Sequence, residues 1–128
     1  MRKARAAIVD TGIVYALADK ADAWHARAVE SVAGYTGRLI VPLSVIPEAC
    51  YLLNAYLGPS AEIAFLDALL RREMSVEPVT TPDVARAAAI LKRYADANIG
   101  FVDASVVAVA ERLGITTILT TDRRTSPS

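Results

Sequence analysis

The sequence of 128 residues has little of several features that define common protein classes. It has one cysteine, Cys50, so a single chain offers neither an internal disulfide nor a thiolate zinc site. Its 14 basic and 14 acidic residues balance, which excludes the broad basic surface of proteins that hold nucleic acid mainly by phosphate charge. Asp10 interrupts the apolar run Ala6–Val9, far short of a signal core or a membrane span. We therefore expect a cytoplasmic protein without a membrane segment.

Apolar residues make up 54% of the chain, enough for one domain with a core. Short β-branched runs alternate with helical patterns, which predicts a three-layer α/β/α fold around a parallel sheet of four strands. We expect residues 1–124 to form one domain and residues 125–128 to be a disordered tail. The predicted strands are Ala6–Val9, Arg38–Val41, Ser75–Val79 and Thr116–Thr120. The predicted helices are Ile13–Ala18, Ala23–Val32, Ser44–Leu57, Ser60–Arg72, Thr81–Tyr94 and Phe101–Leu113.

Three of these helices carry terminal signals in the sequence. Ser44 is a candidate N-cap, with Pro47 in the first turn, where its missing N–H does no harm. A cap residue, a proline and an acid follow one another at Thr81, Pro82 and Asp83. Gly114 is a candidate C-cap for the helix that begins at Phe101.

Four acids are expected at one edge of this sheet. Ligands of parallel sheets bind beyond the carboxyl ends of the strands. Asp10 ends the first strand and Asp122 follows the fourth. Glu48 and Asp103 lie near the N-termini of helices that could enter from the same edge.

Asp103 gives the strongest indication that these acids share a ligand. Its helix neighbours Val106 and Val107 are apolar, and an ionised acid on a buried face is costly unless it is paired or bound to metal. Two like charges about 4 Å apart repel by roughly 4 kcal/mol at an effective dielectric near 20. Mg²⁺ or Mn²⁺ would cancel that repulsion and prefers oxygen ligands. The predicted metal ligands are Asp10, Glu48, Asp103 and Asp122.

Each acid taken alone could also have a simpler role. Asp10 and Asp122 could be turn residues, and Glu48 and Asp103 could be favourable charges in first helical turns. The joint pattern is more specific than any single member.

Four segments carry a resemblance to a known family: Ile8-Val-Asp-Thr-Gly12, Ser44-Val-Ile-Pro-Glu48, Phe101-Val-Asp-Ala-Ser105 and Ile118-Leu-Thr-Thr-Asp-Arg-Arg124. In order and spacing they resemble a PIN domain, and within that superfamily a VapC-type toxin ribonuclease, over residues 6–124. The resemblance implies a parallel sheet, five-stranded in the family, and RNA cleavage that depends on Mg²⁺ or Mn²⁺. It also implies a homodimer and a cognate antitoxin that blocks the site.

The resemblance assigns residues to that activity. It makes Asp10, Glu48, Asp103 and Asp122 the acidic catalytic site, and Thr11 matches the small hydroxyl residue that often follows the first aspartate. The sequence departs from the family pattern in one respect. Family members usually continue past the last acid into a further strand, often through an Asp-Phe pair, whereas here Thr-Ser-Pro-Ser follows residue 124.

The resemblance implies hydrolysis of an RNA phosphodiester, and the residues point to a water activated by the metal as the nucleophile. The only histidine, His25, cannot form a two-histidine acid–base pair and is expected on a helix surface. Asp10 and Asp103 are expected as the main metal ligands, with Glu48 and Asp122 completing a second metal position or orienting water.

The sequence also leaves several alternatives open. Arg123 and Arg124 either hold the RNA backbone or form a solvated pair. A catalytically silent PIN-like module that acts by protein association is the main alternative function. A phosphatase with an aspartyl nucleophile is less consistent, because Gly12 occupies the position where a second aspartate is needed. A response-regulator receiver is also less consistent, because Asp10 has no acidic neighbour.

The apolar excess indicates a protein with partners. Aromatic and apolar side chains on early helices are the kind that anchor interfaces. We expect one helical surface to form a symmetric dimer and another to accept an antitoxin segment that folds on binding. The candidate contact residues are Trp24, Tyr51, Tyr56 and Leu57.

Overall fold

The sheet is parallel throughout and has the strand order β3-β2-β1-β4. It is seen in a computed structural model that describes residues 5–121. The strands are β1 (Ala6–Val9), β2 (Arg38–Pro42), β3 (Ser75–Glu77) and β4 (Ile118–Leu119). In the register, Ile8 of β1 lies between Ile40 of β2 and Ile118 of β4. The order reverses at β1, because the chain adds β2 on one side and β4 on the other.

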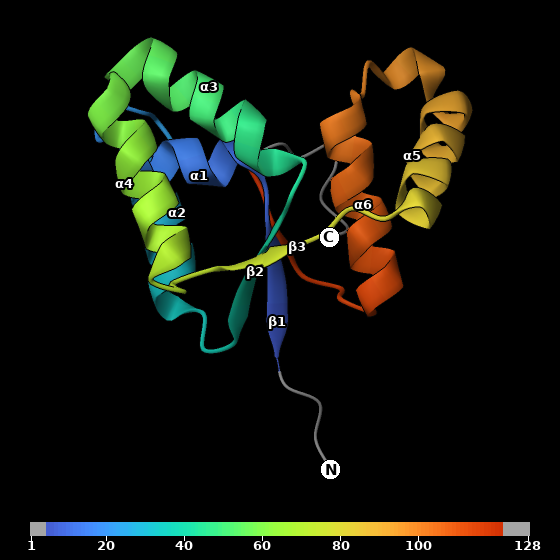
Figure 1. Cartoon of the computed structure of the whole chain (residues 1–128), viewed down its shortest axis with the longest axis horizontal. Coiled ribbons are helices and arrows are strands. Elements are labelled where there is room, and N and C mark those ends of the chain that lie inside the picture. The colour runs from blue at the N-terminus through green and yellow to red at the C-terminus, as the bar shows by residue number, and fades with distance from the viewer. Residues whose placement is uncertain (1–4, 122–128) are drawn as a thin grey trace.

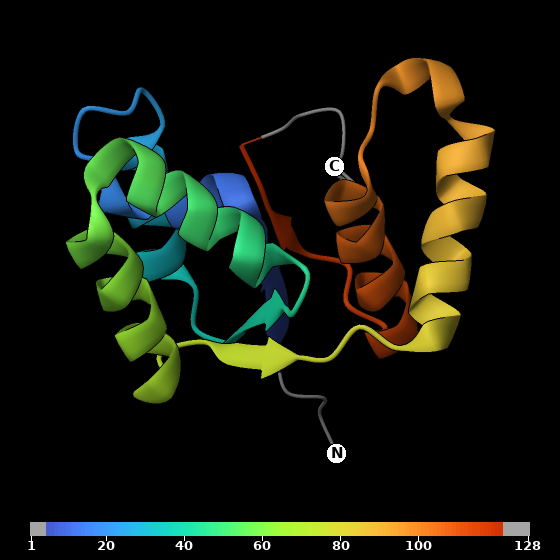
Figure 2. The same cartoon turned by 45° about the horizontal axis from the view of Figure 1, so that its top comes forward.

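Helices cover the sheet on both sides (Figure 1). Their bounds are α1 (Thr11–Ala18), α2 (His25–Gly34), α3 (Val45–Leu57), α4 (Pro59–Leu70), α5 (Thr81–Arg93) and α6 (Phe101–Leu113). A short 3₁₀ turn, η1 (Ala95–Ala97), follows α5. Figures 1 and 2 show α1 to α4 grouped on one side and α5 with α6 on the other. The prediction of a three-layer fold with four parallel strands is confirmed.

The core lies between the sheet and the inner faces of these helices. Both faces of β1 are covered, so Ile8 and Val9 are fully buried, as expected for a central parallel strand. Leu53 of α3 and Val109 of α6 reach the core from the two helical layers. Burial of such side chains stabilises the fold by about 1.5–3 kcal/mol each.

Most predicted elements are present, with changes at their ends. The strand Ala6–Val9 and the helix Phe101–Leu113 have the predicted bounds. The predicted fourth strand, Thr116–Thr120, shrinks to two residues because only Ile118 and Leu119 pair with β1. The predicted disordered tail, residues 125–128, lies outside the described residues.

Two helix caps differ in detail from the prediction. Ser44 is the N-cap residue of α3, as predicted, but its side chain makes no capping hydrogen bond and its hydroxyl bonds to Ser105 instead. The cap of α5 is Thr80, one residue before the predicted Thr81. Thr80 Oγ1 accepts from the backbone N–H of Asp83, and Asp83 accepts from the N–H of Thr80, which completes a capping box. The prediction for Gly114 is confirmed, since its left-handed φ of 69° ends α6.

Candidate active site at the carboxyl edge of the sheet

Asp10 is the central acid of this edge. It follows β1 and has extended backbone angles, and it is also the N-cap of α1, where its Oδ1 accepts from the N–H of Ile13 at 3.0 Å. Its Oδ2 accepts a hydrogen bond from the hydroxyl of Thr120. The residue is 8% exposed. One buried carboxylate therefore connects the end of β1, the start of α1 and the segment after β4.

Thr11 and Gly12 shape the space beside that carboxylate. The hydroxyl of Thr11 is buried and has no hydrogen-bond partner within residues 5–121. A buried polar group in that state is costly unless a ligand or water completes its bonding. A Cβ placed on Gly12 would collide with the side chain of Thr121, the last described residue. The absence of a side chain at Gly12 thus lets the segment after β4 approach α1 closely.

Glu48 and Asp103 occupy the first turns of α3 and α6. Asp103 is half-buried, whereas Glu48 is exposed. The two turns are connected, because the hydroxyl oxygens of Ser44 and Ser105 are 2.6 Å apart. Figure 1 shows the starts of α3 and α6 facing each other beyond the carboxyl end of β1. The fold thus brings three of the four predicted acids to one edge of the sheet.

The convergence of all four acids remains a prediction. Within residues 5–121, no group of three or more His, Cys, Asp or Glu side chains lies close enough together to hold a metal ion. Asp122 follows Thr121 directly in the chain but lies outside the described residues, as do Arg123 and Arg124. The described part offers oxygen ligands, namely the buried carboxylate of Asp10 and the unsatisfied hydroxyl of the next residue, and oxygen ligands fit a hard divalent cation and its waters.

Sequence reasoning missed two hydroxyl residues of this edge, Thr120 and Ser105. Thr120 binds the carboxylate of Asp10 across 110 positions of the chain. Ser105 is fully buried and donates to the carbonyl of Val102 as well as contacting Ser44. Both lie inside segments that carried the family resemblance, and their position two residues from an acid was the available signal.

His25 differs from its predicted position on a helix surface. Its ring is half-buried, and Nδ1 lies 2.7 Å from the carbonyl oxygen of Ala16, to which it must donate. The bond ties the start of α2 to α1. His25 therefore has a structural role away from the acidic edge.

A second acid, Asp83, is buried for a different reason. Its two carboxylate oxygens accept hydrogen bonds from Nε of Arg112 at 3.0 and 3.1 Å. Nη1 of Arg112 also forms an ion pair with Oε2 of Glu77 at 3.1 Å. The Arg112 guanidinium holds the pKa of the Asp83 carboxyl below its ordinary value, although burial acts in the opposite direction. This network joins α5, α6 and β3, so it supports the fold and not the acidic edge.

Comparison with models of protein families identifies the family of this chain. The model described as "PIN domain" matches residues 7–126. The chain belongs to the PIN domain family. The family predicted from four sequence segments is thereby confirmed.

Two known proteins resemble most of this chain. Ribonuclease VapC26 of Mycobacterium tuberculosis is 34% identical over 117 residues, which are 91% of this chain and 87% of that protein. The crystal structure of Mycobacterium tuberculosis VapC20, described as a sarcin–ricin loop cleaving toxin, has a TM-score of 0.87 at 29% identity. That match covers 93% of this chain and 92% of VapC20.

A more distant match extends the likeness of fold. A toxin–antitoxin complex from Klebsiella pneumoniae has a TM-score of 0.70 at 17% identity, over 91% of this chain and 86% of that one. In the described part of this PIN domain, no helix has the length and apolar character needed to cross a membrane.

Proposed function

We propose that this PIN domain is a Mg²⁺- or Mn²⁺-dependent endoribonuclease and the toxin of a toxin–antitoxin pair. The observation that carries the proposal is the setting of Asp10. A carboxylate that is 8% exposed lies at the carboxyl end of the central strand, between the N–H of Ile13 and the hydroxyl of Thr120. The acid-bearing turns of α3 and α6 meet at the same edge through Ser44 and Ser105.

In this proposal the four acids have different roles in binding the metal. Asp10 and Asp103 are the main ligands of the cation, and Glu48 and Asp122 complete a second position or orient water. A divalent cation bound there lowers the pKa of water and offsets negative charge that develops on the phosphate. Donors to both carboxylate oxygens hold Asp10 in one orientation, which limits the reorganisation needed at the reacting centre.

Other side chains of the edge contact the RNA in this proposal. The buried hydroxyl of Thr11, which has no partner among the described residues, is available to hydrogen-bond the substrate or its water. Arg123 is proposed to hold a backbone phosphate through its guanidinium. We propose that the protein acts on cellular RNA in the cytoplasm.

The experiment that tests the proposed activity is RNA cleavage by the purified protein. We expect cleavage with Mn²⁺ or Mg²⁺, none with excess chelator, and a loss of about 100-fold or more for Asp10→Asn. Asp67→Asn, an exposed acid of α4, is the matched control and should cleave normally. Persistent cleavage by Asp10→Asn at the wild-type rate would remove Asp10 from the site.

One observation favours the alternative of a catalytically silent module. Among residues 5–121 the acids do not form a group of three that could hold a metal. A silent module would show neither cleavage nor a shift in melting temperature with Mn²⁺, yet would still bind its partner. Metal-dependent cleavage that Asp10→Asn abolishes excludes this alternative.

The proposed partners are an antitoxin and a second copy of the chain. Tyr51 and Tyr56 of α3 are each 71% exposed, and Leu70 of α4 is 80% exposed, so α3 and α4 present large apolar side chains to solvent. Exposed aromatic residues of this kind commonly anchor interfaces. Trp24, in contrast, is half-buried and lies under the guanidinium of Arg27.

Co-expression with the product of the neighbouring small reading frame tests the partner proposal. We expect a dimer of the chain by mass in solution, a complex with that product, and slower RNA cleavage in the complex. Tyr51→Ser is expected to weaken one of the two associations without changing the melting temperature of the monomer. A monomer that binds no such product, and cleaves equally fast in its presence, contradicts the toxin assignment and leaves a metal-dependent nuclease.

A further inference from the structure

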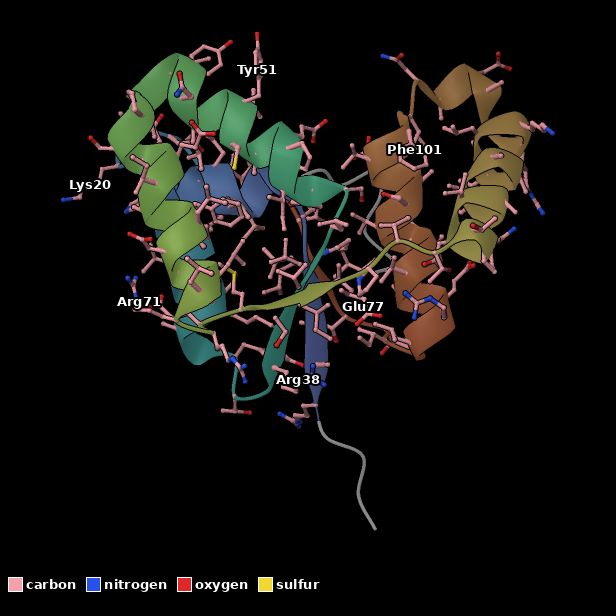
Figure 3. All side chains as sticks on the ribbon, in the orientation of Figure 1. Lys20, Arg38, Tyr51, Arg71, Glu77 and Phe101 are labelled. Carbon is pink, nitrogen blue, oxygen red and sulfur yellow. The ribbon has the colours of Figure 1, made fainter. Side chains whose placement is uncertain are left out.

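A polar cavity of about 590 Å³ lies at the end of the sheet opposite the acids. It forms where β1 and β2 begin, beside the loop between α6 and β4. In Figure 3, Arg38, which lines the cavity, is labelled at the lower end of the molecule, whereas Phe101, at the start of α6, is labelled in its upper part. The cavity is therefore separate from the proposed active site and has the volume of a small-molecule pocket.

The charge of this cavity is positive. Arg5 and Arg38 both line it, and neither guanidinium has an ion-pair partner within the described chain. Glu77 also lines it, but its carboxylate is already paired with Arg112 at 3.1 Å. Two arginines and one acid that is already paired leave the lining with an excess of positive charge, and guanidinium groups match the geometry of a phosphate.

The backbone holds the two arginines side by side. The N–H of Arg38 donates to the carbonyl of Arg5 at 2.9 Å, at the start of the pairing of β1 with β2. A Cβ at Gly37 would lie 2.6 Å from the Cβ and the carbonyl oxygen of Arg5, so only glycine allows this approach. The main chain thus fixes how close residues 5 and 38 come, and both arginines line the cavity from these positions.

The remaining lining is suited to a nucleoside. The half-buried ring of Tyr35 and the half-buried Ile115 offer an apolar and aromatic surface to a base. The hydroxyls of Thr116 and Thr117 are available as donors and acceptors to a sugar. We propose that this cavity binds a nucleoside phosphate, with Arg5 and Arg38 on the phosphate and Tyr35 beside the base.

Calorimetric titration of the full chain with adenosine monophosphate tests this site. We expect saturable one-to-one binding, weakened about tenfold or more in the double variant Arg5→Ala/Arg38→Ala. The matched control is Lys20→Ala/Lys92→Ala, which removes the same charge from two exposed lysines that do not line the cavity. Arg38→Lys keeps the charge, and it should retain more affinity than Arg38→Ala. Since Arg5 and Arg38 are exposed, these variants should melt as the wild type does.

A second titration distinguishes a free nucleotide from the end of an RNA strand as the ligand. In chelator, which prevents metal-dependent cleavage, a short RNA with a 5′ phosphate is compared with adenosine monophosphate. Tighter binding of the RNA identifies the end of a strand as the ligand, and tighter binding of the mononucleotide identifies a free nucleotide. Any of three results overturns the proposal. The mononucleotide does not bind, the lysine control loses as much affinity as the arginine double variant, or inorganic phosphate binds as tightly as the mononucleotide. None of these depends on whether the chain cleaves RNA.

Discussion

The hydroxyl oxygens of Ser44 and Ser105 lie 2.6 Å apart and connect the start of α3 to the start of α6. The single proton of Ser105 goes to the carbonyl of Val102, so Ser44 acts as the donor to Ser105. The acids Glu48 and Asp103 stand within one turn of these serines along their helices. A hydrogen bond between two neutral serines therefore sets the distance between the first turns of α3 and α6, which carry Glu48 and Asp103.

Removal of this bond should lower stability and cleavage together. For Ser105→Ala we expect unfolding to become easier by about 1–2 kcal/mol, because the hydroxyl of Ser44 loses its acceptor in a closed site. Ser31→Ala, at an exposed position of α2, is the control and should change stability by less than about 0.5 kcal/mol. Denaturant unfolding measures the stability of both variants, and the RNA cleavage assay measures their activity. A variant as stable and as active as the wild type would contradict a spacing role for Ser105.

The ion pair between Asp83 and Arg112 should contribute strongly to stability and depend on pH. Asp83 is 2% exposed, so Asp83→Asn should cost about 2–3 kcal/mol at neutral pH. The control is Glu111→Gln, which breaks the exposed pair with Arg86 between the same two helices and should cost less than about 1 kcal/mol. Equal losses in the two variants would mean that burial gives the Asp83 pair no advantage.

The sign of the pH dependence follows from the lowered pKa of Asp83. The unfolded chain then binds this proton more readily than the folded one, so stability rises with pH between the two pKa values. The contribution is complete above the unfolded value of about 3.9 and is lost as pH falls through the folded value. The stability difference between wild type and Asp83→Asn should therefore be constant near neutrality and shrink below about pH 4.

Local patterns predicted the elements of this fold, but not the contacts between distant residues. The helix Phe101–Leu113 was predictable to the residue, because Gly100 and Gly114 bound an apolar run. The hydrogen bond of the Ser44 side chain was not predictable, because its partner lies 61 positions away and a local pattern suggests only a capping bond for such a serine. The bond from Thr120 to Asp10 spans 110 positions, so the neighbours of Asp10 gave no sign of it.

The same distinction applies to the acidic site. The strand order places Asp10 at the reversal point of the sheet, the position at which the rule for parallel sheets predicts a ligand. The separations between the carboxylates depend on side-chain packing in three separate segments. No periodicity of a single sequence encodes those separations.

Gly12 should be required for the position of the segment after β4. In Gly12→Ala the new Cβ meets Thr121, whose displacement should reduce RNA cleavage about 10- to 100-fold with little change in stability. Gly34→Ala is the matched control within a helix, since nothing lies within 4 Å of its added Cβ. It should leave cleavage unchanged and raise stability by up to about 1 kcal/mol. Equal cleavage by both variants would show that Thr121 moves aside without consequence.

Asp103→Asn tests whether the acids repel one another without metal. Two effects of the substitution oppose each other. The carboxylate in the first turn of α6 interacts favourably with the helix dipole by about 0.3–1 kcal/mol, which the variant loses. Repulsion between carboxylates about 4 Å apart is several times larger, at roughly 4 kcal/mol, so its relief should dominate if the acids converge.

The melting temperature of Asp103→Asn without metal should therefore equal or exceed that of the wild type, and its rise on adding Mn²⁺ should be smaller. A cation that binds only the folded state stabilises it by about 2.7 kcal/mol at 100 times its dissociation constant, so the wild-type shift is measurable. Asp67→Asn, exposed on α4, should keep both the wild-type melting temperature and the full Mn²⁺ shift. If Asp103→Asn melts several degrees lower without metal, repulsion between the acids does not dominate at Asp103, and its carboxylate stabilises the fold through the helix dipole or a hydrogen bond.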